Sequence, residues 1–261
     1  MTPFFEWQDA PPARFAVIGD PVSHSLSPAM HTAALQEIQE PGEYLAVRVP
    51  AGQVVEAMTH LAHLGYEGVN VTVPHKFEVQ EFCLFQSEFS RRVGAVNTVD
   101  MRARKGHNTD GPGFMESLEA HSFSDKRALV LGVGGSGKSV AVALADAGWE
   151  VAVWNRTPET ANELADQFLL TFAGIEIPDL TAFDLVVQAT SASLQGVSLP
   201  IHWETARLST LAYDLMYREG ERRSCILQLQ KVSQCGMVGR CWLDKVPWRW
   251  RSGWVEQCQF K

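Results

Sequence analysis

The chain has 261 residues, which is enough for one large domain or two modest domains with apolar cores. Its net charge of −8 argues against nucleic acids and anionic membranes as partners. The N-terminus lacks the pattern of a secretory signal, no apolar stretch is long enough to span a bilayer, and the five cysteines lack metal-ligand spacing. We therefore expect a cytoplasmic protein that needs neither a metal ion nor disulfides.

The first part of the chain alternates strand-like and helix-like segments, which is typical of a mainly parallel α/β sheet. Strands are expected at 15–18, 44–49 and 68–73. Helices are expected after Pro28, near 54–64 and in a later stretch before residue 104.

A connecting helix is expected to begin near Asp110. After it, strand and helix alternate again, with strands expected at 128–131, 151–154, 185–189 and 211–215. The sequence therefore predicts an α/β fold in two units, over 1–104 and 105–220, with a separate tail over 221–261.

The segment around Ser25, Ser27 and Pro28 predicts a helix start, because Ser is a favoured N-cap and Pro a favoured first residue. The free N–H groups of such an end attract anions. Two serine hydroxyls beside them would suit a carboxylate. An alternative is that Ser27 serves as a cap alone, and both roles are compatible.

The run from Asn70 to Lys76, NVTVPHK, places an amine at the end of a strand. Asn97 with Thr98, and then the run from Asn108 to Gly111, add amide, hydroxyl and carboxylate groups. Lys76 and Asp110 would form an acid–base pair in such a site. Without the other motifs, either charge would be read as a solvated surface residue.

Residues 132–137, GVGGSG, lie between an apolar strand and a helix. Glycines at these places let the backbone turn tightly and approach a pyrophosphate at the helix N-terminus. The same pattern also occurs in plain strand-to-helix connections. After the next strand, Asn155, Arg156 and Thr157 stand where an NAD site would carry an acidic residue. A guanidinium and a hydroxyl favour a 2′-phosphate, and hence NADP.

Taken together, the motifs resemble shikimate dehydrogenase, which reduces 3-dehydroshikimate with NADPH in the route to chorismate and the aromatic amino acids. The resemblance covers about the first 220 residues. It runs in order through residues 23–28 (SHSLSP), NVTVPHK, 95–98 (AVNT), 108–111 (NTDG), the glycine loop, 155–157 (NRT), 189–191 (ATS) and 213–217 (YDLMY).

The resemblance implies that residues 1–104 form the shikimate-binding substrate domain and residues 105–220 a Rossmann-type NADP-binding domain. It also implies roles for single residues in a cleft between these two units. Ser25 and Ser27 would bind the shikimate carboxylate, and Lys76 would act as the acid–base residue beside Asp110, which orients its ammonium. The ring hydroxyls would be bound by Thr72, Asn97, Asp110 and Tyr217. NADP would be bound by Gly132, Gly134, Gly135, Ser136, Gly137, Asn155, Arg156, Thr157, Thr190 and Leu215. The protein would be a monomer or a homodimer.

Three alternatives stay open. A quinate/shikimate dehydrogenase that prefers NAD is disfavoured because its expected acidic residue is absent directly after Asn155 and Arg156, where Thr157 stands instead. A non-catalytic paralogue that binds NADP or shikimate is disfavoured because Lys76 and Asp110 are both present. A defective gene product that no longer folds fully is favoured by the tail.

The tail after about Gly220 departs from the family. From Arg222 onward the chain has no alanine but four of its five cysteines, four of its eight tryptophans, and eight Lys and Arg against two Asp and Glu. Read with a two-base shift, codons for this segment permit TPFL after Glu221 and GWAMLVGQG across Met237 to Val246. Both resemble family motifs, the second the one with its substrate-binding glutamine. We therefore expect a frameshift, a poorly packed tail without the closing helices of the substrate domain, and weakened turnover.

Overall fold

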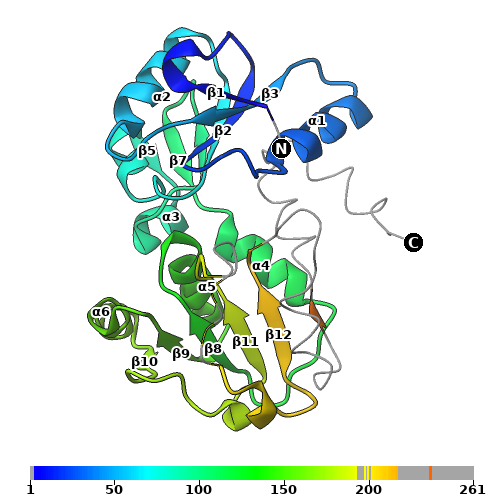
Figure 1. The fold of residues 1–261 in the computed structure, drawn as a ribbon, viewed down its shortest axis with the longest axis vertical. Helices are drawn as coiled ribbons and strands as arrows, with labels where there is room; N and C mark the ends of the chain where they lie inside the picture. Colours follow the sequence, from blue (N-terminus) through cyan, green and yellow to red (C-terminus); the bar gives the residue numbers. More distant parts are fainter. Residues whose placement is uncertain (1–2, 193–196, 198, 200, 217–234, 237–261) are drawn as a thin grey trace. The chain divides into compact units, whose positions relative to one another are not determined.

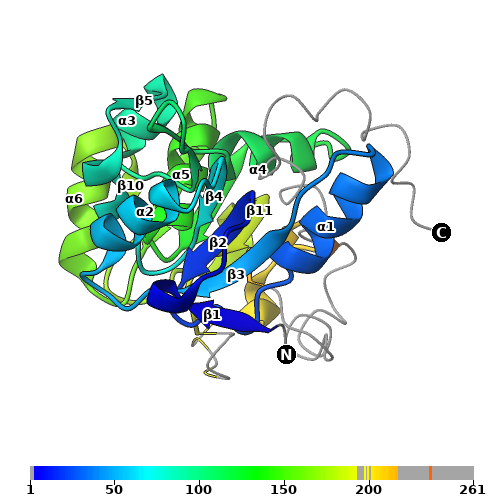
Figure 2. The same cartoon turned by 90° about the horizontal axis from the view of Figure 1, so that it is seen from above.

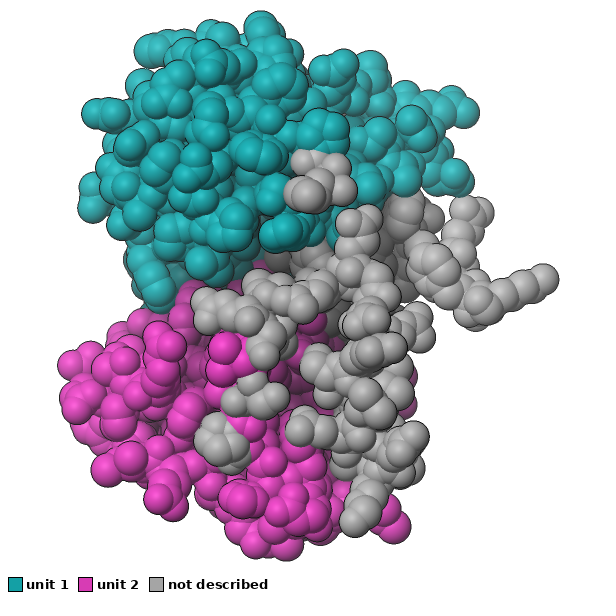
Figure 3. Space-filling model, viewed as in Figure 1, with its two compact units in different colours: residues 1–109, 245–261 teal, residues 110–244 magenta. Residues whose placement is uncertain are grey.

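The computed structural model describes residues 3–192, 197, 199, 201–216 and 235–236. They form two compact units, shown in separate colours in Figure 3, and the second begins at Asp110. This boundary lies beyond the expected one at 104 because a strand at Lys105–His107 pairs into the first sheet. Most of the tail lies outside the described residues, so our expectations for it stay predictions.

The first unit contains seven strands and three α-helices among its described residues (Figure 1). In chain order they are β1 (Phe4–Glu6), β2 (Phe15–Gly19), α1 (Ser27–Glu37), β3 (Tyr44–Arg48), α2 (Val54–His63), β4 (Gly68–Val71), β5 (Phe85–Gln86), α3 (Glu88–Val93), β6 (Thr98–Asp100) and β7 (Lys105–His107), with short 3₁₀ turns at Trp7–Asp9 and Glu78–Phe82.

The strand order of this sheet is β1-β3-β2-β4-β6-β7-β5, with β6 antiparallel to both of its neighbours. Alternate residues of β2 enter different cores: Phe15 and Val17 join a cluster with Leu35 of α1, whereas Ala16 and Ile18 join one with Met58 of α2. This alternation is the period of two of a strand buried on both faces. Figure 2 shows α1 and α2 on opposite sides of the strands.

The second unit is an α/β unit with six strands and three α-helices among its described residues. In chain order they are α4 (Asp110–Leu118), β8 (Arg127–Leu131), α5 (Gly135–Asp146), β9 (Glu150–Trp154), α6 (Pro158–Phe168), β10 (Thr171–Phe172), β11 (Leu185–Gln188), β12 (Leu211–Asp214) and β13 (Cys235–Gly236), with 3₁₀ turns at Leu180–Ala182 and Trp203–Thr205.

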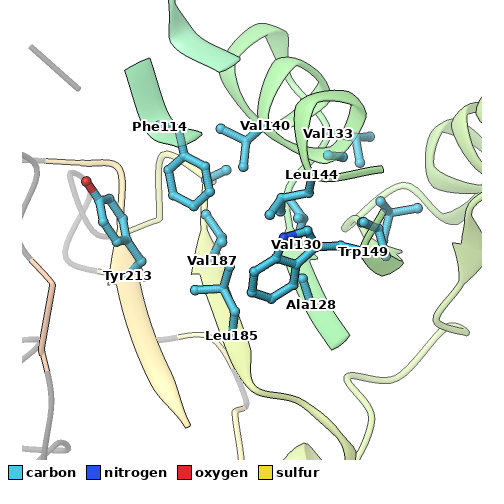
Figure 4. Packing of buried hydrophobic residues seen from close by; sticks show 14 of the residues in the cluster. Phe114, Ala128, Val130, Val133, Val140, Leu144, Trp149, Leu185, Val187 and Tyr213 are labelled. Carbon is cyan, nitrogen blue, oxygen red and sulfur yellow. The ribbon is translucent and has the colours of Figure 1, made fainter. Parts of the chain in front are cut away.

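All strand pairs of the second sheet are parallel, and their order is β10-β9-β8-β11-β12-β13. Numbered along the chain, this is the order 3-2-1-4-5-6 of a Rossmann fold. Figure 4 shows the core on one face of the sheet, where Phe114 of α4 meets Tyr213 of β12 edge to face with ring centroids 4.9 Å apart. The packing of Phe114 places α4, and Asp110 with it, in this unit.

The predicted α/β fold class, with a Rossmann-type second unit, is therefore confirmed. The strands that sequence patterns did not predict are β1, β5, β6, β7, β10 and β13. Each has only two or three residues, too few to show an alternating pattern. Their strand character comes from pairing with neighbours that lie elsewhere in the sequence.

Candidate functional site

The glycine loop joins β8 to α5, and two of its glycines are required by close contacts. Gly132 has φ of +96°, and a Cβ there would lie 2.7 Å from Cγ2 of Thr190. A Cβ on Gly137 would collide with the carbonyl oxygen of Gly132. Gly132 makes the tight turn, and Gly137 lets α5 approach the strand end.

Gly134 differs from these two glycines. It is exposed, and a Cβ built on it would meet no atom within 4 Å. It precedes α5 as its N-cap residue without a side-chain cap, so the first N–H groups of the helix lie beside this open space. A pyrophosphate fits this place, because the backbone can approach it and the helix dipole favours its charge.

The other predicted cofactor residues follow the carboxyl ends of neighbouring parallel strands. Asn155 and Thr157 follow β9, Thr190 follows β11, and Leu215 follows β12. The side chain of Asn155 accepts a hydrogen bond from the N–H of Val133 at 3.4 Å, which joins the β9 end to the loop. In this strand order, β8 and β11 flank the point where ligands of such sheets bind.

Two cationic side chains near the glycine loop, Arg156 and Lys138, have different surroundings. Arg156 is exposed, and none of the ion pairs found among the described residues involves it, so its guanidinium is accessible to a 2′-phosphate. Lys138 of α5 instead lies over the ring of Phe168, with its amine 3.4 Å from Oε1 of Gln167. Burial lowers the pKa of the Lys138 amine. The arginine is therefore the better candidate for a cofactor contact.

Asp110 is the first residue of α4 and is only 3% exposed. Its Oδ2 accepts a hydrogen bond of 3.0 Å from the hydroxyl of Ser136, in the first turn of α5. Two helix N-termini therefore lie close to this carboxylate, and both favour negative charge. The structure brings a predicted catalytic residue and a predicted cofactor residue into direct contact.

In the first unit, Ser25 and Ser27 are both buried at the start of α1. The expectation that Ser27 caps the helix is wrong. Ser27 is already the first residue of α1, and it is the hydroxyl of Ser25 that accepts the N–H of Ser27 at 3.2 Å. The reason is a tight turn, in which Ser25 N–H bonds to Val22 O and Leu26 is already helical. Ser25 therefore acts as the local acceptor.

Lys76 lies in the turn that follows β4 and is only 4% exposed. Its carbonyl accepts the N–H of Val96 at 2.8 Å, so the backbone of Lys76 is fixed beside Asn97. Thr72, nearer to β4, donates its N–H to Ile18 O of β2 at 2.9 Å. Both residues are thus held at the carboxyl edge of the sheet by bonds to other segments.

Asn97 is 1% exposed, and its amide is oriented by its partners. Its Oδ1 accepts the backbone N–H of Thr109 at 3.0 Å, and because an N–H can only donate, this contact identifies the oxygen. The same Oδ1 accepts the hydroxyl of Thr98 at 3.1 Å, and Nδ2 donates to Oγ1 of Thr109 at 3.1 Å. The amide therefore has one defined orientation.

This bonding continues into the sheet through Asn70 and Tyr44, to which sequence patterns assigned no role in the site. Nδ2 of Asn70 donates to Oγ1 of Thr98 at 3.0 Å, and Tyr44 donates its hydroxyl to Oδ1 of Asn70 at 2.7 Å. The ring of Tyr44 stacks on His31 of α1 with centroids 4.2 Å apart. Asn70 begins the NVTVPHK motif, and a polar residue inside a buried strand was the signal that could have revealed it.

Tyr217, the remaining predicted substrate residue, lies outside the described residues. Within the described part of the chain, no group of His, Cys, Asp and Glu side chains is arranged to hold a metal ion. The described helices also include none long and apolar enough to cross a membrane.

The strand order, the glycine loop and the strand-end residues define a dinucleotide-binding α/β protein of two units. Two family models match the chain, one for the shikimate dehydrogenase substrate binding domain over residues 17–99 and one for shikimate / quinate 5-dehydrogenase over residues 116–198. The chain is 38% identical over 218 residues to the NADP(+) shikimate dehydrogenase of Desulfitobacterium hafniense, covering 79% of this chain and 80% of that one. It is 42% identical over 209 residues to that of a Thermus thermophilus strain, covering 78% of both chains.

Solved structures agree. A Thermus thermophilus shikimate 5-dehydrogenase in complex with NADP(H) and shikimate is 41% identical, covers 79% of both chains and superposes with a TM-score of 0.70. The shikimate dehydrogenase of Aquifex aeolicus is 29% identical, covers 88% of both chains and gives a TM-score of 0.80. The chain belongs to the shikimate dehydrogenase family.

Proposed function

We propose that this chain catalyses the reversible, NADP-dependent reduction of 3-dehydroshikimate to shikimate, an oxidoreduction of a CH–OH group in the biosynthesis of chorismate and the aromatic amino acids. The observation that carries the proposal is Lys76. A lysine that is only 4% exposed at the carboxyl edge of a sheet, with its backbone bonded beside Asn97, has an environment that a solvated surface lysine lacks.

NADP would be held by the loop residues Gly132, Gly134, Gly135, Ser136 and Gly137. The strand-end residues Asn155, Arg156, Thr157, Thr190 and Leu215 would contact the rest of the cofactor. Support comes from the open space at Gly134 and the exposed guanidinium of Arg156. A planar guanidinium matches a phosphate by paired hydrogen bonds. The bound cofactor would exchange a hydride with the substrate carbon.

Shikimate would be bound by Ser25 and Ser27 at its carboxylate and by Thr72, Asn97, Asp110 and Tyr217 at its hydroxyls. Lys76 would donate a proton to the developing alkoxide in reduction and receive it in oxidation, with Asp110 orienting its ammonium. The fixed amide of Asn97 supports this assignment, because discrimination between polyols needs donors and acceptors in defined orientations.

Two other functions share these residues. A quinate/shikimate dehydrogenase that uses NAD would need a ribose-binding acidic residue, whereas Arg156 favours NADP. A catalytically defective protein that binds NADP or shikimate would be consistent with the unusual composition from Arg222 onward, but Lys76 and Asp110 are both present. We further propose that the protein works in the cytoplasm as a monomer or homodimer, without nucleic acid, in line with its net charge of −8.

One assay separates these functions: NADP reduction with shikimate, run beside calorimetric binding of NADPH and of shikimate. Turnover with NADP and shikimate supports the proposal. Faster turnover with NAD and quinate points to the first alternative. Binding of both ligands without turnover identifies the defective protein, and sequencing the coding DNA then tests whether a shifted frame spells TPFL and MLV-x-Gln.

A further inference from the structure

We propose that Ser136 is a positioning residue for the reaction, because its hydroxyl fixes the Asp110 carboxylate and thereby connects the cofactor loop to the catalytic group. This inference rests on the proposed function. Its basis is the hydrogen bond of 3.0 Å from Ser136 Oγ to Asp110 Oδ2, which joins residues 26 positions apart in the sequence.

Ser136 has two polar groups with different tasks. Its backbone N–H belongs to the first turn of α5, where the hydrogen bond of Lys138 N–H to Gly134 O is the first of the helix. The N–H of Ser136 is therefore one of those that a helix cannot use internally. This group is therefore left for the pyrophosphate that we assign to the start of α5, whereas the hydroxyl donates to Asp110.

The packing between α4 and α5 makes this contact specific. Phe114, one turn after Asp110, and Val140, one turn after Ser136, belong to the same buried cluster (Figure 4). The two helix starts therefore cannot move apart without opening an apolar core. Within this frame, the hydroxyl is the part of Ser136 that selects one orientation of the Asp110 carboxylate.

The consequence is that one residue serves both halves of the site. A phosphate that binds the loop orders Ser136, and the ordered hydroxyl holds Oδ2 of Asp110, so its other oxygen is presented in a fixed direction. Hydrogen bonds to charged groups are about twice as strong as neutral ones. Loss of this one should therefore impair shikimate recognition and turnover more than cofactor binding.

The test compares Ser136→Ala with Ser136→Thr, which keeps a hydroxyl, in the full chain. For Ser136→Ala we expect kcat/KM for shikimate to fall about tenfold, as for a lost charged hydrogen bond. The Kd of NADPH alone should change less than about twofold. Ser136→Thr should recover most of the loss. In an Asp110→Asn background, adding Ser136→Ala should have little further effect, because the partner charge is already gone.

Ser139→Ala is the matched control, since its hydroxyl lies on the same helix but donates to Gly135 O at 2.6 Å, within α5. It should leave kcat/KM near the wild-type value. If Ser136→Ala instead weakens NADPH and leaves kcat/KM for shikimate unchanged at saturating cofactor, or if its effect adds fully to that of Asp110→Asn, the inference is wrong.

Absence of turnover in the wild type would refute the proposed activity but not this inference. In that case the same variants are compared by the calorimetric Kd of shikimate in the presence of NADPH, a pair that cannot react. A weakening of about tenfold in Ser136→Ala, abolished in the Asp110→Asn background, supports the inference. An unchanged Kd, or no shikimate binding by the wild type, overturns it.

Discussion

The first unit buries polar side chains in and beside its sheet, among them Ser25, Asn70, Lys76 and Asn97, whereas the second unit has a glycine loop and the first N–H groups of α5 at the end of β8. The difference fits the two ligand types that we propose for these units. A ligand with several hydroxyl groups must be recognised by side chains with defined donors and acceptors. A pyrophosphate can instead be bound by the backbone N–H groups of a helix end. Substitutions should therefore act through lost functional groups in the first unit and through added atoms in the second.

The largest effect is expected at Lys76. Lys76→Ala should lower kcat by about 10²–10⁴-fold, because proton transfer is lost, and should change KM for shikimate far less. Lys105→Ala, an exposed lysine of the same unit, is the control. Steady-state kinetics decide the matter. Turnover that persists with a raised KM would make Lys76 a binding residue.

In the second unit, substitutions that add a Cβ to a glycine of the loop should affect stability or cofactor binding. Gly137→Ala should destabilise the protein by about 1–3 kcal/mol or more, because its Cβ meets the carbonyl of Gly132. Gly134→Ala should leave urea unfolding nearly unchanged, since nothing lies within 4 Å, but should weaken NADPH at the place of the phosphate. Equal stability of the two variants would contradict this difference between the glycines.

Arg156 is the exception in the second unit, because here a side chain rather than the backbone should determine the affinity for the cofactor. Arg156→Ala should weaken NADP by a few kcal/mol, roughly 1.5–3 kcal/mol for charged hydrogen bonds, and leave NAD nearly untouched. Calorimetric Kd values for both cofactors measure this. A similar loss of affinity for NADP and NAD would show that Arg156 does not bind the 2′-phosphate.

Thr98 tests the buried polar network of the first unit. Thr98→Val keeps the shape but removes the donor to Asn97 and the acceptor for Asn70, so KM for shikimate should rise by an amount equivalent to about 1 kcal/mol. Thr210→Val is the matched control in the second unit, where a buried hydroxyl donates to Phe183 O. It should lower stability without a change in KM. A KM effect of equal size in both variants would mean a general loss of packing.

The smallest effect concerns pH. Burial, and then the charge of Lys105, lower the pKa of His107 from its ordinary value of 6.5. The unfolded chain therefore binds the proton more readily, and the first unit should lose stability as pH falls below about 6.5. His107→Gln should flatten this dependence in urea unfolding at pH 5.5 and 7.5. If stability fell more steeply with falling pH in the variant than in the wild type, the expected direction of the His107 effect would be wrong.

The sequence alone determined those features of the protein that depend on residues adjacent in the chain. The strand, glycine loop and helix around residues 128–146 were readable because tight turns need glycine and long apolar strands carry their own pattern. Local patterns also predicted the two-unit α/β class and, at Arg156, the preference for NADP. The order of the motifs along the chain gave the family resemblance. These parts needed no knowledge of which distant segments meet.

Only the tertiary structure decided which residues touch across long sequence distances. The amide orientation of Asn97 depends on Thr109, 12 positions away, and the link from Asn70 to Thr98 spans 28. Sheet register sets both contacts, and a register is fixed by packing of the whole sheet rather than by a local pattern. The bond from Ser136 to Asp110 likewise exists because α4 packs beside α5, and Ser27 lost its predicted capping role because the turn before it is already tight.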